Sequence, residues 1–193
     1  MTDGASPAVA SPPVLETARL RLRPLALADA AAIAAIADDL DIARWLTRMP
    51  HPYAVEDAVY FIREVAPAEW CWLVTGKDDG GAMGVIGLRP IADEGGPMRP
   101  AAELGYWLGR GFWGQGFATE AGVAVLAWAD AALRLAAIVA GRYAENERSG
   151  RVLAKLGFVE TGRSTRESRS LGRRLPYVDL IRADAQPILR PIV

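Results

Sequence analysis

A glycine-rich turn stands between a strand pattern and the start of a helix in residues 103–121, which read E-L-G-Y-W-L-G-R-G-F-W-G-Q-G-F-A-T-E-A. Glycines let a backbone approach a ligand closely. The first N–H groups of the following helix lack intrahelical partners, and with the positive end of the helix dipole behind them they suit a phosphate. The stretch therefore predicts a binding site for a phosphate-bearing molecule.

Two glycine patterns overlap in this turn, and the first is that of a nicotinamide dinucleotide site. Gly109, Gly111 and Gly114 satisfy G-x-G-x-x-G after a strand and before a helix. That fingerprint also needs an acidic residue at the end of the next strand to hold the ribose, and residues 136–141 contain none. Arg142 follows and is able to meet a 2′-phosphate, so this interpretation is disfavoured but stays open. No G-K-S/T sequence follows the glycines, which excludes a P-loop.

The second pattern, W-G-Q-G-F-A at residues 113–118, resembles the acetyl-CoA pyrophosphate loop of the GNAT acyltransferase superfamily. More narrowly, it is similar to the RimJ/RimL branch of ribosomal-protein N-terminal acetyltransferases. The resemblance continues at 16–25, 50–58 and 146–158, where N-E-R-S-G is followed by an aromatic residue beyond the helix end. It covers nearly the whole chain after the N-terminal segment. The superfamily's loop usually begins with Gln or Arg, and Trp113 stands there instead.

The resemblance implies an acetyl-CoA site along this strand, turn and helix. The thioester carbonyl is expected to meet a backbone N–H near Trp107 or Leu108, where the family's strand bulges and splays from its neighbour. Arginines are candidates for the phosphates. The expected cofactor-binding residues are Trp107, Leu108, Arg110, Trp113, Gly114, Gln115, Gly116, Phe117, Ala118, Thr119, Asn146, Ser149 and Arg151.

Acetyl transfer to an amine needs a base for the amine, a stabilised oxyanion and a proton for the thiolate. Glu103 precedes the turn where similar enzymes place their base, although a surface glutamate at a strand edge fits equally. Ser149 resembles the serine that protonates the thiolate in this branch, or it is a small residue that makes room for pantetheine. Many family members use a tyrosine further along that helix, but Leu153 stands at the matching place. Asn146 either pairs with pantetheine amides or caps the helix, and both roles are compatible.

Composition and charge exclude several other kinds of site and partner. The 193 residues carry 22 basic and 23 acidic side chains, so bulk charge gives no reason to expect a nucleic-acid or membrane partner. Cys71 is the only cysteine and His51 the only histidine, which excludes an internal disulfide and a clustered Cys/His zinc site. The first residues are not a signal peptide. We therefore expect a cytoplasmic protein without a metal, as a monomer or homodimer.

The pattern of elements predicts a mixed α/β fold with about four helices. The resemblance implies that this fold is a single GNAT-type domain at 15–185, with a mostly antiparallel, splayed sheet and the helices flanking it. A disordered tail is expected at 1–14, and a C-terminal tail at 186–193. The expected helices are one capped by Asp29 that runs to Ala37, and 55–65, 117–133 and 146–156. The expected strands are 19–25, 70–75, 83–88, 102–108, 136–143, 158–161 and 177–182, with loops at 93–100 and 162–174.

The sequence thus predicts an acetyl-CoA-dependent N-acetyltransferase that acts by direct transfer. The acceptor is a primary amine, either a protein N-terminal α-amine or a small molecule. Two alternatives stay open: a CoA-binding module without turnover, and an NAD(P)-binding oxidoreductase.

Overall fold

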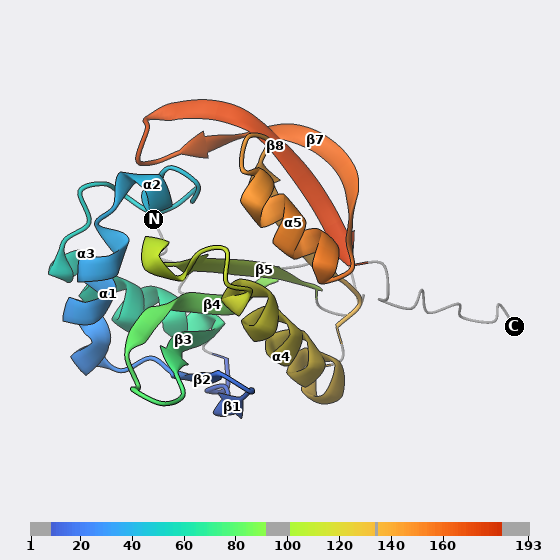
Figure 1. The fold of residues 1–193 in the computed structure, drawn as a ribbon. Coiled ribbons are helices and arrows are strands. Elements are labelled where there is room, and N and C mark those ends of the chain that lie inside the picture. Colours follow the sequence, from blue (N-terminus) through green and yellow to red (C-terminus); the bar gives the residue numbers. More distant parts are fainter. Residues whose placement is uncertain (1–8, 92–100, 134, 183–193) are drawn as a thin grey trace, which may run out of the picture.

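The chain folds around one eight-stranded sheet (Figure 1). The computed structural model describes residues 9–91, 101–133 and 135–182. The strands are β1 (Leu15–Glu16), β2 (Leu20–Pro24), β3 (Trp70–Gly76), β4 (Ala82–Ile91), β5 (Ala101–Leu108), β6 (Ile138–Tyr143), β7 (Phe158–Ser168) and β8 (Arg173–Arg182). The helices are η1 (Leu27–Asp29), α1 (Ala30–Ala37), α2 (Leu40–Ala43), α3 (Val55–Tyr60), η2 (Phe61–Val65), η3 (Ala66–Ala68), η4 (Arg110–Phe112), α4 (Phe117–Ala132) and α5 (Glu147–Lys155).

One parallel strand pair divides the sheet. The strand order is β1-β2-β3-β4-β5-β6-β8-β7, and every neighbouring pair is antiparallel except β5–β6. β5 and β6 pair only through Ala102 with Ile138 and Glu103 with Val139. Beyond Glu103 the two strands separate, so the predicted splay is confirmed.

Two hydrophobic clusters lie on opposite faces of the sheet, because successive side chains of a strand point to opposite sides. Trp72 and Val74 of β3 pack in the cluster that contains residues of α4 and α5, and the Trp72 ring meets Trp128 of α4 at 5.1 Å between centroids. Cys71 and Leu73 of the same strand pack with α1 and α3. The helices α4 and α5 therefore cover one face, and α1 and α3 cover the other.

The sequence predicted that the Asp29 side chain caps α1, but it does not. Its carboxylate instead accepts from both terminal nitrogens of Arg23, at 2.6 and 2.8 Å, and from the Ala26 N–H at 2.8 Å. The hydrogen bonds from Arg23 hold the pKa of Asp29 below its usual value, against the effect of burial. The correction follows from Arg23, whose guanidinium lies across the turn where a sequence pattern cannot place it.

The prediction of a polar loop at 162–174 is wrong. Strands β7 and β8 pair along almost their whole length, from Phe158 opposite Arg182 to Ser168 opposite Arg173. Most of β7 is exposed, so its polar residues need no buried alternation to form a strand. Figure 1 shows this hairpin arching over the domain towards α2.

Two further segments differ from expectation. The four-residue helix α2 was not predicted, and it begins at Asp39, whose side chain accepts from the Asp41 N–H. Residues 9–14, expected to be disordered, contact the domain: Val9 N–H donates to Pro67 O at 2.9 Å, and the Trp72 indole donates to Pro13 O at 2.7 Å. Residues 1–8 and 186–193 of the predicted tails and the predicted loop 93–100 lie outside the described residues.

The other predicted helices and strands lie within a few residues of their expected positions, whereas β1 and the short helices η1, η3 and η4 were not predicted. In the described part of the chain, α4 and the shorter helices all lack the length and apolar character needed to cross a membrane.

Candidate active site

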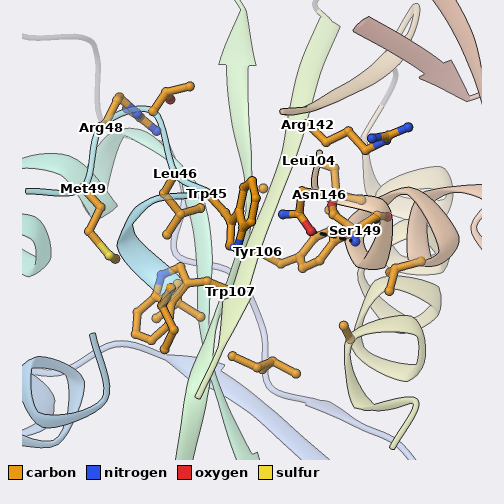
Figure 2. Close-up of a pocket in the computed structure, with 18 of the residues that line it drawn as sticks. Trp45, Leu46, Arg48, Met49, Leu104, Tyr106, Trp107, Arg142, Asn146 and Ser149 are labelled. Atoms are coloured by element: carbon orange, nitrogen blue, oxygen red, sulfur yellow. Dashed lines mark hydrogen bonds between the residues drawn. The ribbon is translucent and has the colours of Figure 1, made fainter. Parts of the chain in front are cut away.

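A cleft of about 1610 Å³ runs through the opening between β5 and β6. At one end it is lined by the turn after β5 and by the first turns of α4 and α5. At the other end it is lined by residues 45–50 and by the β7–β8 hairpin. Figure 2 shows Trp45, Leu46 and Arg48 on one side of β5 and Ser149 on the other. This volume exceeds the usual range for a single small ligand, about 300–1,000 Å³, and leaves space for two reactants.

The turn before α4 has the backbone of an anion cradle. Gly114 (φ +76°) and Gly116 (φ +85°) adopt the left-handed conformation, in which a Cβ is strained. Gly109 has an ordinary φ of −56°. The positive φ values thus fall on the W-G-Q-G pattern and not on the first glycines of the dinucleotide pattern.

Arg19, immediately before β2, holds this turn from a distant part of the chain. Its guanidinium donates to Gln115 O at 3.1 Å and to Glu120 Oε2 at 2.8 Å, and it lies 4.3 Å from the Phe117 ring centroid. Burial alone would raise the pKa of Glu120, but hydrogen bonds from Thr17 and Arg19 outweigh it and lower that pKa. Arg19 was not among the predicted site residues. Its contact with the turn spans almost a hundred residues, and no local pattern in the sequence signals it.

Trp113 ties the turn to the end of β5. Its indole N–H donates to Leu108 O at 2.7 Å, and the guanidinium of Arg148 lies 5.1 Å from its ring centroid. The departure from the superfamily's usual first residue therefore has a structural role here. Arg148 lines the cleft beside Arg151 and Lys155, and only Arg151 of these three was predicted.

Hydrogen bonds fix which backbone N–H groups of β5 face the opening. Gly109 N–H donates to a β4 carbonyl at 2.8 Å, and Ala102 N–H donates to Ala137 O, on the β6 side, at 3.1 Å. Along a strand, successive backbone N–H groups point alternately to the neighbouring strand on one side and on the other. The N–H of Trp107 therefore points to β4, and the N–H of Leu108 points into the opening. Of the two predicted candidates for the thioester carbonyl, Leu108 has the suitable direction.

The expected bulge in β5 is absent. Its register with β4 is continuous from Leu108 opposite Gly84 to Ala101 opposite Ile91. Gly84 has a φ of +154°, and a Cβ there would lie 2.2 Å from the Trp107 carbonyl oxygen. Gly84 of β4 thus allows β4 and β5 to approach closely. The splay therefore lies between β5 and β6 and not between β4 and β5.

The first turn of α5 brings Asn146 and Ser149 to the cleft. Asn146 caps the helix, since its Oδ1 accepts from the Ser149 N–H at 3.2 Å, as the capping alternative predicted. The Ser149 hydroxyl lies 2.9 Å from the hydroxyl of Tyr106, which comes from β5 (Figure 2). Burial raises the pKa of Tyr106 to about 12, although the Ser149 hydrogen bond and the charge of Arg142 oppose the rise. Tyr106 was not among the predicted site residues.

Glu103 lies on β5 at the point where the strands separate. Its Oε2 forms an ion pair with Arg89 of β4, and both residues line the cleft. Burial, and after it the charge of Glu103, raises the pKa of Tyr177 on β8. Glu103 and Tyr106 are three residues apart, so their side chains lie on opposite faces of the sheet. Glu103 therefore faces the side of residues 45–50, and Tyr106 faces α5.

Most predicted residues line one cleft, and two differ in orientation. Gln115 is not among the lining residues, because its amide turns back to donate to Gly111 O at 2.7 Å. Arg110 lines the cleft, but its guanidinium pairs with Asp41 at 2.8 Å and Asp39 at 3.7 Å beside α2. The predicted residues that line the cleft are Glu103, Trp107, Leu108, Arg110, Trp113, Gly114, Gly116, Phe117, Ala118, Thr119, Asn146, Ser149 and Arg151.

The far end of the cleft joins two distant segments. Arg169 N–H, at the hairpin turn, donates to Thr47 O at 3.2 Å, which closes the cleft on that side. Arg48 donates to Glu69 Oε1 at 3.1 Å in the same wall. Basic and acidic side chains alternate around this end, namely Arg48, Asp57, Glu69, Arg89, Glu103, Arg166, Glu167 and Arg169.

The only histidine lies outside the cleft, and the only cysteine is buried. His51 Nδ1 lies 3.4 Å from Asp38 Oδ1, and His51 is not among the residues that line the cleft. Cys71 is 4% exposed, and burial raises the pKa of its thiol far above the ordinary value, so it remains a thiol. Within the described residues no group of three or more His, Cys, Asp or Glu side chains is placed to hold a metal ion.

Comparison with known proteins decides the family. The family profile described as "Acetyltransferase (GNAT) domain" matches residues 19–159, well over half of the chain. The chain belongs to the GNAT acetyltransferase family. It is 31% identical over 155 residues to the uncharacterized N-acetyltransferase YoaA of Bacillus subtilis (strain 168), which covers 78% of this chain and 85% of that protein.

Two solved structures show the same fold. The ribosomal-protein-S5-alanine acetyltransferase from Vibrio fischeri has a TM-score of 0.70 at 22% identity, over 90% of this chain and 99% of that one. The Microcin C7 self immunity acetyltransferase MccE, in complex with acetyl-CoA and AMP, has a TM-score of 0.70 at 18% identity, over 86% and 92%. The predicted family, fold class and assignment to the N-acetyltransferases are confirmed.

Family membership and geometry together remove the dinucleotide alternative. This GNAT sheet has one parallel strand pair in its described part, whereas a dinucleotide fold is built on several. Arg142, the residue that might have met a 2′-phosphate, donates to Tyr143 O at 3.2 Å and to Ala144 O at 2.6 Å.

Proposed function

We propose that this GNAT enzyme moves an acetyl group from acetyl-CoA directly to a primary amine, either a protein N-terminal α-amine or the amine of a small molecule. The supporting observation is the opening between β5 and β6, which connects the glycine turn to Glu103 through one cleft. Glu103 and Ser149 lie on its two sides, so a base and a hydroxyl flank the path that the acetyl group takes.

The cofactor end fits acetyl-CoA. The left-handed glycines Gly114 and Gly116 point the turn's amides and the first turn of α4 at the pyrophosphate. Arg148, Arg151 and Lys155 of α5 line the same end and supply positive charge for the phosphates. The Leu108 N–H faces the thioester carbonyl, and it stabilises the oxyanion as the carbonyl is attacked.

Glu103 acts as the base for the acceptor amine, directly or through a water. The nitrogen–carbon bond forms as the carbon–sulfur bond breaks. One proton passes from the amine to Glu103 and then to solvent, and the departing thiolate, which accepts a hydrogen bond from Ser149, takes up one proton from solvent to give free CoA. An α-amine has a pKa of about 7.7–8.0 and is partly neutral at pH 7, whereas a lysine amine near 10.4 requires more help. The Arg89 ion pair fixes the Glu103 carboxylate at the opening.

Direct transfer is favoured over an acetyl-enzyme, because an enzyme nucleophile must be activated. Cys71 is buried and stays protonated, and the only histidine pairs with Asp38 outside the cleft. The acceptor end carries mixed charges, so it favours neither a strongly cationic nor a strongly anionic acceptor.

A thiol-release assay with acetyl-CoA and a panel of amines tests the proposal. The panel contains short peptides with free N-termini and small-molecule amines. Glu103→Gln should lower turnover by roughly 10²- to 10⁴-fold on the best acceptor, as expected for loss of a general base. Binding of CoA, measured by calorimetry, should be retained.

Glu64→Gln is the matched control, since Glu64 is exposed on η2 and outside the cleft. It should leave turnover unchanged. Unchanged turnover in Glu103→Gln would refute the base assignment. Binding of CoA with no thiol release on any amine would favour the alternative of a binding module without turnover.

A further inference from the structure

Tyr106 and Ser149 form a pair of hydroxyls at the place where the strands separate. Their oxygen atoms are 2.9 Å apart, and the Tyr106 hydroxyl also donates to the Ser149 carbonyl oxygen at 3.3 Å. Both residues line the cleft, one from β5 and one from the third position of α5. We infer that Tyr106 is a positioning residue for acetyl transfer, whose hydroxyl donates to Ser149 Oγ and so directs the serine proton at the departing sulfur. The inference rests on the proposed function, which places Ser149 beside that sulfur.

The Tyr106 hydroxyl is the donor and the Ser149 hydroxyl oxygen is the acceptor, because the Ser149 proton is needed by the sulfur. The Ser149 N–H is already bound by Asn146 Oδ1, so the hydroxyl is the group of this residue that can turn to the sulfur. A hydrogen bond to a charged acceptor is about twice as strong as one between neutral groups. Once negative charge develops on the sulfur, the serine O–H is therefore drawn to it, and its oxygen is left to accept from Tyr106.

Tyr106 serves as a permanent donor and not as the proton source. Burial raises its pKa to about 12, so the phenol stays protonated at neutral pH. A thiol titrates near 8.5, and proton transfer from such a phenol to a thiolate is unfavourable. The chain from Tyr106 to Ser149 to sulfur instead stabilises the thiolate through two aligned hydrogen bonds, each of which polarises the other.

The arrangement also explains how this chain manages without a tyrosine at the place of Leu153. Leu153 is buried in the core, with 1% of its surface exposed. The phenol comes from the neighbouring strand and reaches the serine from the opposite side of the opening. The charged side chains on β5, β6 and α5 are Glu103, Arg142, Glu147, Arg148, Arg151 and Lys155, and all are unchanged when the Tyr106 oxygen is removed.

The pKa of the CoA thiol bound to the full-length protein tests the inference. Thiolate absorbance in the ultraviolet is followed against pH with free CoA as the probe, so no acceptor is needed. Tyr106→Phe should raise the pKa of the bound thiol by about one pH unit, the size expected from one hydrogen bond to a charged group. Ser149→Ala should raise it by at least as much, and the double variant should add nothing beyond Ser149→Ala. In the thiol-release assay Tyr106→Phe should lower kcat about 10-fold with the KM for acetyl-CoA unchanged.

Tyr143→Phe is the control, because Tyr143 is a buried tyrosine that does not line the cleft, and its hydroxyl donates to Glu167 O at 2.7 Å. It should leave the bound thiol's pKa unchanged. If Tyr106→Phe binds CoA and its bound thiol titrates as in the wild type while Ser149→Ala shifts, the Tyr106 inference is overturned alone. If Ser149→Ala also titrates as in the wild type, or CoA does not bind, the thiolate assignment in the proposed function fails with it.

Discussion

The two ends of the cleft are built in different ways. The cofactor end comes largely from one continuous stretch, the end of β5, the turn and the start of α4, and its decisive feature is backbone conformation at Gly114 and Gly116. The acceptor end joins residues 45–50 to the β7–β8 hairpin, which are more than a hundred residues apart and meet through Arg169 and Thr47. In the proposed function, the ligand common to the family meets local backbone, and the acceptor is surrounded by side chains from distant segments.

This contrast implies that the two ends respond differently to substitution. A backbone cradle has few acceptable sequences, because only glycine adopts its left-handed positions without strain. Exposed side chains contribute little individually, so a wall made of them can change without loss of the fold. We expect changes at the cofactor end to weaken acetyl-CoA binding strongly and changes at the acceptor end to alter only the acceptor.

The largest effect is expected from Gly116→Val. A non-glycine residue in the left-handed region costs about 1–2 kcal/mol, and a β-branched side chain is worse than most. Together with the displaced amides of the turn, this should weaken CoA binding about 100-fold by calorimetry. Gly111→Ala is the control: a Cβ there meets nothing within 4 Å, and it should change CoA binding little. Equal losses in both variants would contradict the assignment of the cradle to W-G-Q-G.

A smaller effect is expected from Arg19→Met. The variant loses the hydrogen bonds to Gln115 O and Glu120 that hold the turn, while keeping an apolar stem over the Phe117 ring. Hydrogen bonds to charged groups contribute about 1.5–3 kcal/mol, and the half-exposed position of Arg19 reduces this, so the KM for acetyl-CoA should rise about 10-fold. Arg21→Met, two residues further along the chain in β2, should leave that KM unchanged. An unaltered KM in Arg19→Met would show that the turn keeps its shape without this contact.

The smallest effect is expected at the acceptor end from Arg48→Ala. The variant removes the partner of Glu69, but the Arg48 side chain is 64% exposed, and exposed ion pairs contribute about 0–1 kcal/mol. The KM for the best acceptor amine should rise about threefold, and stabilisation by CoA in a thermal-shift assay should equal that of the wild type. A loss of CoA stabilisation as large as that of Arg19→Met would mean that the two ends are not independent.

Sequence patterns predicted the local conformation around the glycine turn and the start of α5 better than the contacts between distant segments. Gly114 and Gly116 have left-handed φ values and the Asn146 side chain caps α5, and these features depend on residues close together along the chain. Tyr106 was not among the predicted site residues, because its contact is with Ser149, which is 43 residues away in sequence, with 2.9 Å between the two hydroxyl oxygens. The strands β7 and β8 were underestimated because an exposed polar hairpin lacks the buried alternation by which strands are recognised.

The sequence by itself determined the family, the mixed α/β fold, the glycine cradle and the capped start of α5, because these depend on residues close together along the chain. Only the tertiary structure decided which groups converge on the opening. It joined Arg19 to the turn, aligned Tyr106 with Ser149 and brought the hairpin to residues 45–50. The physical reason is that side-chain contacts across strands depend on register and on where β5 and β6 part, and no local pattern fixes either.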